Sequence, residues 1–132
     1  MGKLFEPISF GAVTLKSRLA VAPMGTIHAE DGGVSDEQRA YLAERAKGGF
    51  GLIYPSAHTI TDKYEHPHSS GNFLCNESHA QRLKLLADDI HQYGSKLAIQ
   101  LSPGYGRVNV GAPKTTRHVS ASDVPTFWHP NQ

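Results

Sequence analysis

The sequence predicts an α/β protein built around a parallel sheet. Three short apolar runs, at residues 19–22, 51–54 and 96–101, have the composition of buried strands. Segments with helical periodicity separate them, and strands that alternate with helices form parallel sheets through right-handed crossovers. The expected order of elements is therefore hairpin, strand, helix, strand, helix, strand and a long loop.

The N-terminal segment, residues 5–16, is predicted to form a hairpin. Residues 8–10 and 13–15 alternate apolar and polar side chains around a turn at Gly11 and Ala12. The run at 19–22 follows, and Pro23 ends it because proline cannot donate to a strand ladder. Residues 24–33 have no period and are expected to form a loop.

A helix is predicted after this loop. Ser35 and Gln38 form a capping-box pair, and Gly48 with Gly49 ends the helix. Acidic residues begin the helix, basic residues end it, and a modest apolar face is supplied by Tyr41, Leu42 and Ala46.

The second helix has the stronger amphipathic pattern. Apolar residues recur at helical spacing, namely Leu83, Leu86, Ala87, Ile90 and Tyr93. We expect Ser78 to cap it and Gly94 to occupy its C′ position. A polar loop is expected before it, from about Ala57 to Glu77.

The third strand, Lys96 to Leu101, contains Gln100 and opens into a loop with Pro103, Gly104 and Gly106. Parallel strands bury both faces, but two helices cover only one. We therefore expect residues 1–132 to be one partial domain, the N-terminal portion of a (β/α)8 barrel, which needs ~250 residues. It comprises the hairpin 5–16, three strands, two helices and the long loop 102–132. A complete three-layer domain is the alternative, for which the strands are too few.

Composition excludes several classes of function. The net charge of +1 with scattered basic residues gives no reason to expect a nucleic-acid or membrane surface. Cys75 is the sole cysteine, which excludes an intrachain disulfide and fits a reducing compartment. No signal peptide and no apolar run of ~18 residues is present, so we expect a cytoplasmic protein.

Three short signatures resemble the flavin-dependent old yellow enzyme family. They are LFEPI at 4–8 with LKSR at 15–18, APM at 22–24, and QLSPGYGR at 100–107. The branch that the chain resembles most contains 2-enoate, 2,4-dienoyl-CoA and bile-acid-inducible reductases. APMG at 22–25 and ERAKGG at 44–49 with GLI at 51–53 support this branch.

The resemblance implies that FMN lies across the C-terminal mouth of the barrel. Family positions that contact the flavin match Pro23, Met24, Gly25, Ala57 and Gln100, and Arg107 is expected near the flavin or substrate. Small residues let a flat ring approach, and a carboxamide suits the mixed donor and acceptor edge of the flavin.

The implied reaction is hydride transfer from reduced flavin to the β-carbon of an activated alkene of the enoate, enone or dienoyl-CoA class. The substrate-orienting and proton-donating residues of the family come from later strands, so catalytic residues are expected beyond residue 132. In the two-domain branch, FAD, a 4Fe–4S cluster and the NAD(P)H domain also lie beyond this chain. We expect an NAD(P)H-dependent homo-oligomer at full length and an inactive segment on its own.

The chain departs from the family at two places. Gly25 stands where many relatives carry Thr, Cys or His, so side-chain tuning of the flavin is absent there. The usual His-Ala-Gly-Arg end of the third-strand motif is replaced by SPGYGR at 102–107, which puts a role for a histidine in this loop in doubt.

Less specific interpretations remain open for several residues. Gln100 could be a buried amide bonded to a neighbouring strand, and Arg107 a solvated loop residue. His66 and His68 lack a nearby acidic or thiol partner, so no metal site is expected. The alternatives to an enzyme are a short protein that completes a partner's barrel and a small binding module that needs no flavin.

Overall fold

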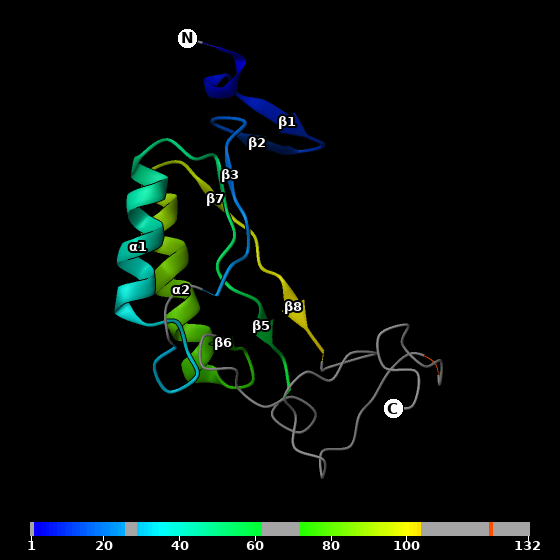
Figure 1. Ribbon diagram of the computed structural model, residues 1–132, viewed down its shortest axis with the longest axis vertical. Helices are drawn as coiled ribbons and strands as arrows, with labels where there is room; N and C mark the ends of the chain where they lie inside the picture. Colours follow the sequence, from blue (N-terminus) through cyan, green and yellow to red (C-terminus); the bar gives the residue numbers. More distant parts are fainter. Residues whose placement is uncertain (1, 26–28, 62–71, 104–121, 123–132) are drawn as a thin grey trace.

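Strands and helices follow one another in the predicted order (Figure 1). The computed structural model describes residues 2–25, 29–61, 72–103 and 122. A short 3₁₀ helix, η1 (Lys3–Phe5), comes first. The remaining elements are β1 (Ile8–Phe10), β2 (Val13–Leu15), β3 (Ala20–Val21), α1 (Asp36–Lys47), β4 (Leu52–Ile53), β5 (His58–Thr59), β6 (Asn72–Phe73), α2 (Glu77–His91), β7 (Lys96–Leu97) and β8 (Leu101–Ser102).

The N-terminal hairpin is confirmed. β1 and β2 are antiparallel, with Ile8 opposite Leu15 and Phe10 opposite Val13. Gly11 has a φ of 55°, in the left-handed region that a tight turn requires and that glycine adopts without strain.

The parallel sheet is confirmed as well. Its strand order is β3-β4-β7, and Val21, Ile53 and Leu97 lie side by side in the register. Both helices lie on the same side of this sheet, as Figure 1 shows. The core between these layers contains Val34, Leu42, Ala46, Ile53, Leu83, Leu86 and Ile90. Each large aliphatic side chain fully buried there contributes about 1.5–3 kcal/mol.

The two helices begin at different kinds of cap. Ser35 caps α1 through the predicted capping box, in which its hydroxyl oxygen accepts from the Gln38 N–H at 3.1 Å. The prediction that Ser78 caps α2 is wrong. Asn76 does so, because its Oδ1 accepts the His79 N–H at 2.9 Å, and Ser78 lies inside the first helical turn.

A second parallel sheet, ordered β6-β5-β8, extends beyond the ends of β4 and β7. Two predictions are corrected by it. The stretch 57–77 is not all loop, because β5 and β6 lie within it. The strand predicted at 96–101 is also interrupted, since residues 98–100 separate β7 from β8. These two-residue strands depend on partners distant in sequence, which local pattern does not reveal.

The junction between the two sheets contains an extra residue. Five residue steps separate Ile53 from His58, whereas four separate their neighbours Leu97 and Leu101. An added residue on one strand of a pair is the mark of a β-bulge, which bends the strand and commonly lies beside a functional site. The bulge lets both Ile53 and His58 be buried although five residue steps, an odd number, separate them.

At the opposite end of the sheet, Lys16 joins the C-terminal ends of both helices. Its Nζ donates to the Ala46 carbonyl of α1 at 2.8 Å and to the Tyr93 carbonyl beyond α2 at 2.6 Å. The expectation that Tyr93 belongs to the apolar face is wrong, because α2 ends at His91 and Tyr93 is 37% exposed. Gly94 reverses the chain there with a φ of 71°.

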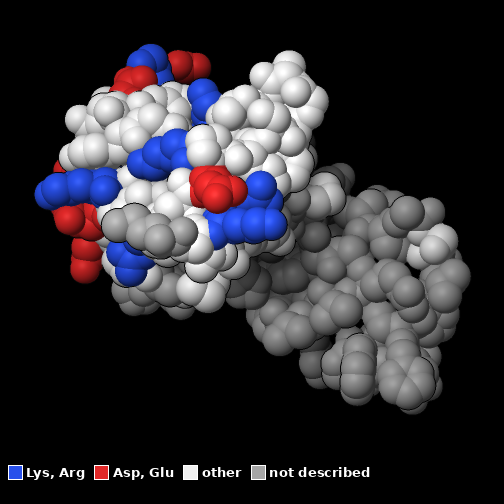
Figure 2. Space-filling model, turned by 90° about the horizontal axis from the view of Figure 1, so that it is seen from above, with Lys and Arg blue, Asp and Glu red and all other residues white. Residues whose placement is uncertain are grey.

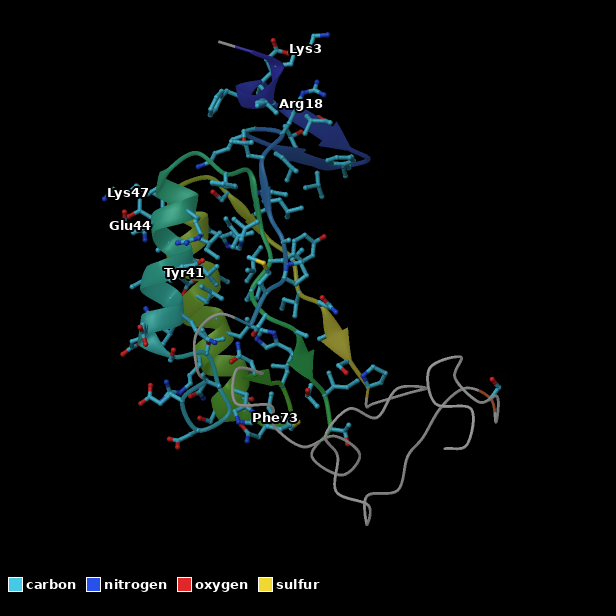
Figure 3. All side chains as sticks on the ribbon, viewed as in Figure 1. Lys3, Arg18, Tyr41, Glu44, Lys47 and Phe73 are labelled. Atoms are coloured by element: carbon cyan, nitrogen blue, oxygen red, sulfur yellow. The ribbon has the colours of Figure 1, made fainter. Side chains whose placement is uncertain are left out.

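Charged side chains of both signs mix on the surface drawn in Figure 2. Several of them pair along the helices, such as Glu44 with Lys47, which project from the outer side of α1 in Figure 3. Arg39 joins the helices through an ion pair with Asp89 of α2 at 2.7 Å. Within the described ranges, no helix is long and apolar enough to cross a membrane.

Candidate functional site

The residues expected to contact a flavin lie at one end of the parallel sheet. Pro23, Met24 and Gly25 follow β3, Ala57 lies between β4 and β5, and Gln100 lies between β7 and β8. Because β3, β4 and β7 are parallel, their carboxyl ends share one edge. This is the edge at which α/β barrels form their ligand sites.

Ala57 and Gln100 are held next to one another. The main-chain N–H of His58 donates to the Gln100 carbonyl at 2.8 Å. Ala57, the residue before His58, is only partly buried, whereas His58 is fully buried. Gln100 likewise precedes Leu101, the register partner of His58, so Ala57 and Gln100 occupy matching positions of the two paired segments. The Gln100 side chain is exposed there, so it is not the buried amide considered as an alternative.

The end of β3 is open to solvent. Pro23, Met24 and Gly25 are exposed, with Met24 at 58%. A hollow between α1 and the ends of β3 and β4 is lined in part by Met24, Tyr41 and Tyr54. At about 20 Å³ it has room for about one water molecule. This hollow is therefore too small for a flavin ring.

His58 is a buried residue of this edge that the sequence did not single out. Its side chain has no exposed surface, and its ring Nδ1 lies 2.9 Å from the Ser56 carbonyl oxygen. Burial lowers the pKa of the imidazole; the hydrogen bond to the Ser56 carbonyl opposes this shift, and His79 adds to it. His58 is therefore neutral at pH 7. Because His58 is a polar residue in a polar stretch of sequence, the local pattern does not indicate that it is buried.

Other buried polar atoms accompany the ring. Ser56 Oγ, His58 Nε2 and both amide atoms of Asn72 make no hydrogen bond with any described residue. Asn72 lies opposite His58 in the pairing of β6 with β5. Phe73, which Figure 3 labels, is the next residue. Its ring stacks on that of His79 at the start of α2.

Two further expectations concern metals and thiols. In the part of the chain that the structure describes, no three His, Cys, Asp or Glu side chains gather as a metal site. Cys75 is exposed and its Sγ donates to the Thr59 carbonyl at 3.3 Å. Arg107, His66 and His68 lie outside the described residues.

The chain matches the model of the NADH:flavin oxidoreductase / NADH oxidase family over residues 3–131. Cinnamate reductase from Clostridium sporogenes is 29% identical over 96% of this chain and 20% of its own length. Old Yellow Enzyme from Pichia sp. AKU4542 superposes on 80% of this chain and 27% of its own, with a TM-score of 0.69 and 25% identity. A 2-naphthoyl-CoA reductase matches 80% of this chain and 16% of its own, with the same TM-score and 32% identity.

These comparisons confirm the predicted fold class. The described strands and helices have the arrangement of part of the (β/α)8 barrel of old yellow enzymes. The chain spans less than a third of the length of each of these relatives. The family match covers nearly every residue, including all three signatures noted in the sequence. The chain belongs to the NADH:flavin oxidoreductase / NADH oxidase family.

Proposed function

We propose that the protein carrying this chain is an FMN-dependent ene-reductase. The observation that carries the proposal is the open face at the carboxyl ends of the strands. There, the main chain at Ala57 lies beside that of Gln100, whose side chain is exposed. The membership of a flavin oxidoreductase family supports the same assignment.

The residues present at this edge fit a flavin. Gly25 and Ala57 carry little or no side chain, so a planar ring can approach the backbone. Gln100 makes no hydrogen bond through its carboxamide to another described residue, and this group offers a donor and an acceptor to the pyrimidine edge. Pro23 and Met24 supply apolar surface at the end of β3.

The work of these residues is binding and orientation. When bound, reduced FMN supplies hydride to the β-carbon of an activated alkene. The chain holds the ring by Gln100 and by close backbone approach, which sets its distance and angle to a substrate. Arg107 is proposed to lie near the flavin or the substrate, where a fixed positive charge would favour an anionic group.

We propose an enoate, enone or dienoyl-CoA as the substrate and NAD(P)H as the reductant. The relatives' names support a conjugated acid or its thioester, since they include a cinnamate reductase and a 2-naphthoyl-CoA reductase. The chain covers a smaller share of these two proteins than of the Pichia enzyme. This difference favours the two-domain branch, in which FAD and a 4Fe–4S cluster would lie in other parts of the protein.

The test is the flavin content and reactivity of the purified protein. We expect FMN to be released on denaturation, and the bound flavin to be reduced by NADH or NADPH under anaerobic conditions. Cinnamate, a cyclic enone and a dienoyl-CoA are then added separately, and reoxidation of the flavin identifies the class of alkene. A colourless protein that does not take up added FMN would refute the proposal.

A further inference from the structure

His58 makes two hydrogen bonds at the predicted flavin edge, one to the neighbouring segment and one within its own. Its main-chain N–H donates to the Gln100 carbonyl at 2.8 Å, which ties β5 to the chain between β7 and β8. Its ring Nδ1 lies 2.9 Å from the carbonyl oxygen of Ser56, two residues earlier in its own strand. The hydrogen bond between the His58 ring and the Ser56 carbonyl therefore spans Ala57, the residue between them.

The chemistry of this contact fixes where the ring carries its hydrogen. A carbonyl oxygen can only accept, so Nδ1 is the protonated nitrogen. Nε2 of the neutral ring is then an acceptor, and it is buried without a partner among the described residues. The ring has no exposed surface, so a molecule bound at this edge does not touch it. Any effect of His58 on such a molecule is indirect.

We propose that His58 is a positioning residue. It fixes the backbone of Ala57 and the position of Gln100 so that both residues can contact FMN. This inference rests on the proposed function. It assigns a role to a residue behind the site rather than in it.

The bulge explains why a positioning group is needed here. Between Ile53 and His58 the strand has one residue more than its neighbour, so the regular ladder does not restrain this segment. Ala57 keeps one long main-chain bond, from the Asn72 N–H to its carbonyl at 3.4 Å. The ring bond to Ser56 supplies the missing restraint on the preceding peptide. Without it, the Ser56 carbonyl is buried with no donor and the segment can rotate.

The experiment compares three variants at this position in the intact protein. H58N keeps a donor nitrogen the same number of bonds from the backbone as Nδ1, H58Q moves the donor one bond further, and H58L removes it while keeping bulk. FMN affinity is measured by fluorescence titration of the apoprotein. Amide exchange over residues 56–59 and 100–102 is measured without flavin.

We expect H58L and H58Q to weaken FMN binding by about tenfold, the size expected when a buried acceptor loses its donor. Exchange should be faster at 56–59 in both. H58N should stay within about threefold of the unchanged protein. I90A is the matched control, because Ile90 is a fully buried core residue of α2 and belongs to neither segment of the predicted flavin edge. It should lower stability and leave FMN affinity unchanged.

Three results would overturn the inference: H58L or H58Q binding FMN as well as the unchanged protein does, H58N losing as much affinity as H58Q, or I90A weakening FMN binding equally. If H58L does not fold, the comparison of H58N with H58Q decides the matter alone. Failure of the unchanged protein to bind FMN would instead refute the proposed function, and the flavin role of His58 with it. Exchange in the apoprotein still reports then whether the ring restrains this segment.

Discussion

Replacement of Lys16 by methionine tests how the end of the sheet opposite the flavin edge is held together. The Lys16 ammonium donates to a carbonyl at the C-terminal end of α1 and to another just beyond α2. Both helix dipoles place partial negative charge there, which favours a cation. K16M keeps the apolar stem of the side chain and removes both hydrogen bonds together with the charge.

The expected loss of stability depends on how far the two hydrogen bonds of Lys16 are exposed to water. One is partly buried and the other exposed, so water replaces part of what is lost. At about 1 kcal/mol for each bond, with the dipole contribution included, K16M should lower the free energy of unfolding by about 2 kcal/mol. The assay is urea denaturation followed by circular dichroism.

K84M is the matched control for this prediction. Lys84 is 73% exposed and forms an exposed ion pair with Asp88, one turn away on α2. Its loss should change the free energy of unfolding by less than about 0.5 kcal/mol. If K16M proves as stable as K84M, Lys16 does not join the helices as described.

Further predictions concern a close backbone approach, a helix cap and a buried histidine. G51A should destabilise the fold by about 1–3 kcal/mol in denaturation, because the new Cβ would lie within van der Waals overlap of the Ser17 carbonyl oxygen, while G2A, with open space around it, should have no effect. N76A should cost about 1 kcal/mol by the same assay and S78A much less, since Asn76 is the cap of α2. Burial holds the pKa of His58 below its ordinary value of 6.5, so the unfolded chain binds more protons as the pH falls past that value. Stability should therefore decline below pH 6.5 in the unchanged protein and less steeply in H58N, and equal slopes would contradict the assignment of a neutral ring.

Elements with local signals could be predicted from the sequence. The Ser35 and Gln38 capping box and the hairpin turn at Gly11 depend on residues a few positions apart, and both are confirmed. The residue that caps α2, Asn76, could not be predicted as readily from the sequence. Asn76 and Ser78 are both good caps, and only the position of the first helical turn decides between them.

The flavin edge could be predicted in outline but not in its supporting contacts. Gln100 could be predicted because it stands near the end of an apolar run and matches a flavin-contacting position of the family, and the pairing of β5 with β8 then places it beside Ala57. His58 and Asn72 were missed because their burial depends on strands that pair across long separations. The bulge also shifts the alternation between Ile53 and His58, so the strand pattern cannot be followed through it.

The proposed role of Gln100 is tested most directly by FMN titration of Q100L beside Q81L. Gln100 is exposed on the proposed flavin face, whereas Gln81 is exposed on α2 and bonds to Glu77. We predict that Q100L binds FMN about tenfold more weakly because the flavin loses its amide partner, and that Q81L binds it normally. Equal FMN affinity in Q100L, Q81L and the unchanged protein would contradict the assignment of this edge of the sheet as the flavin site.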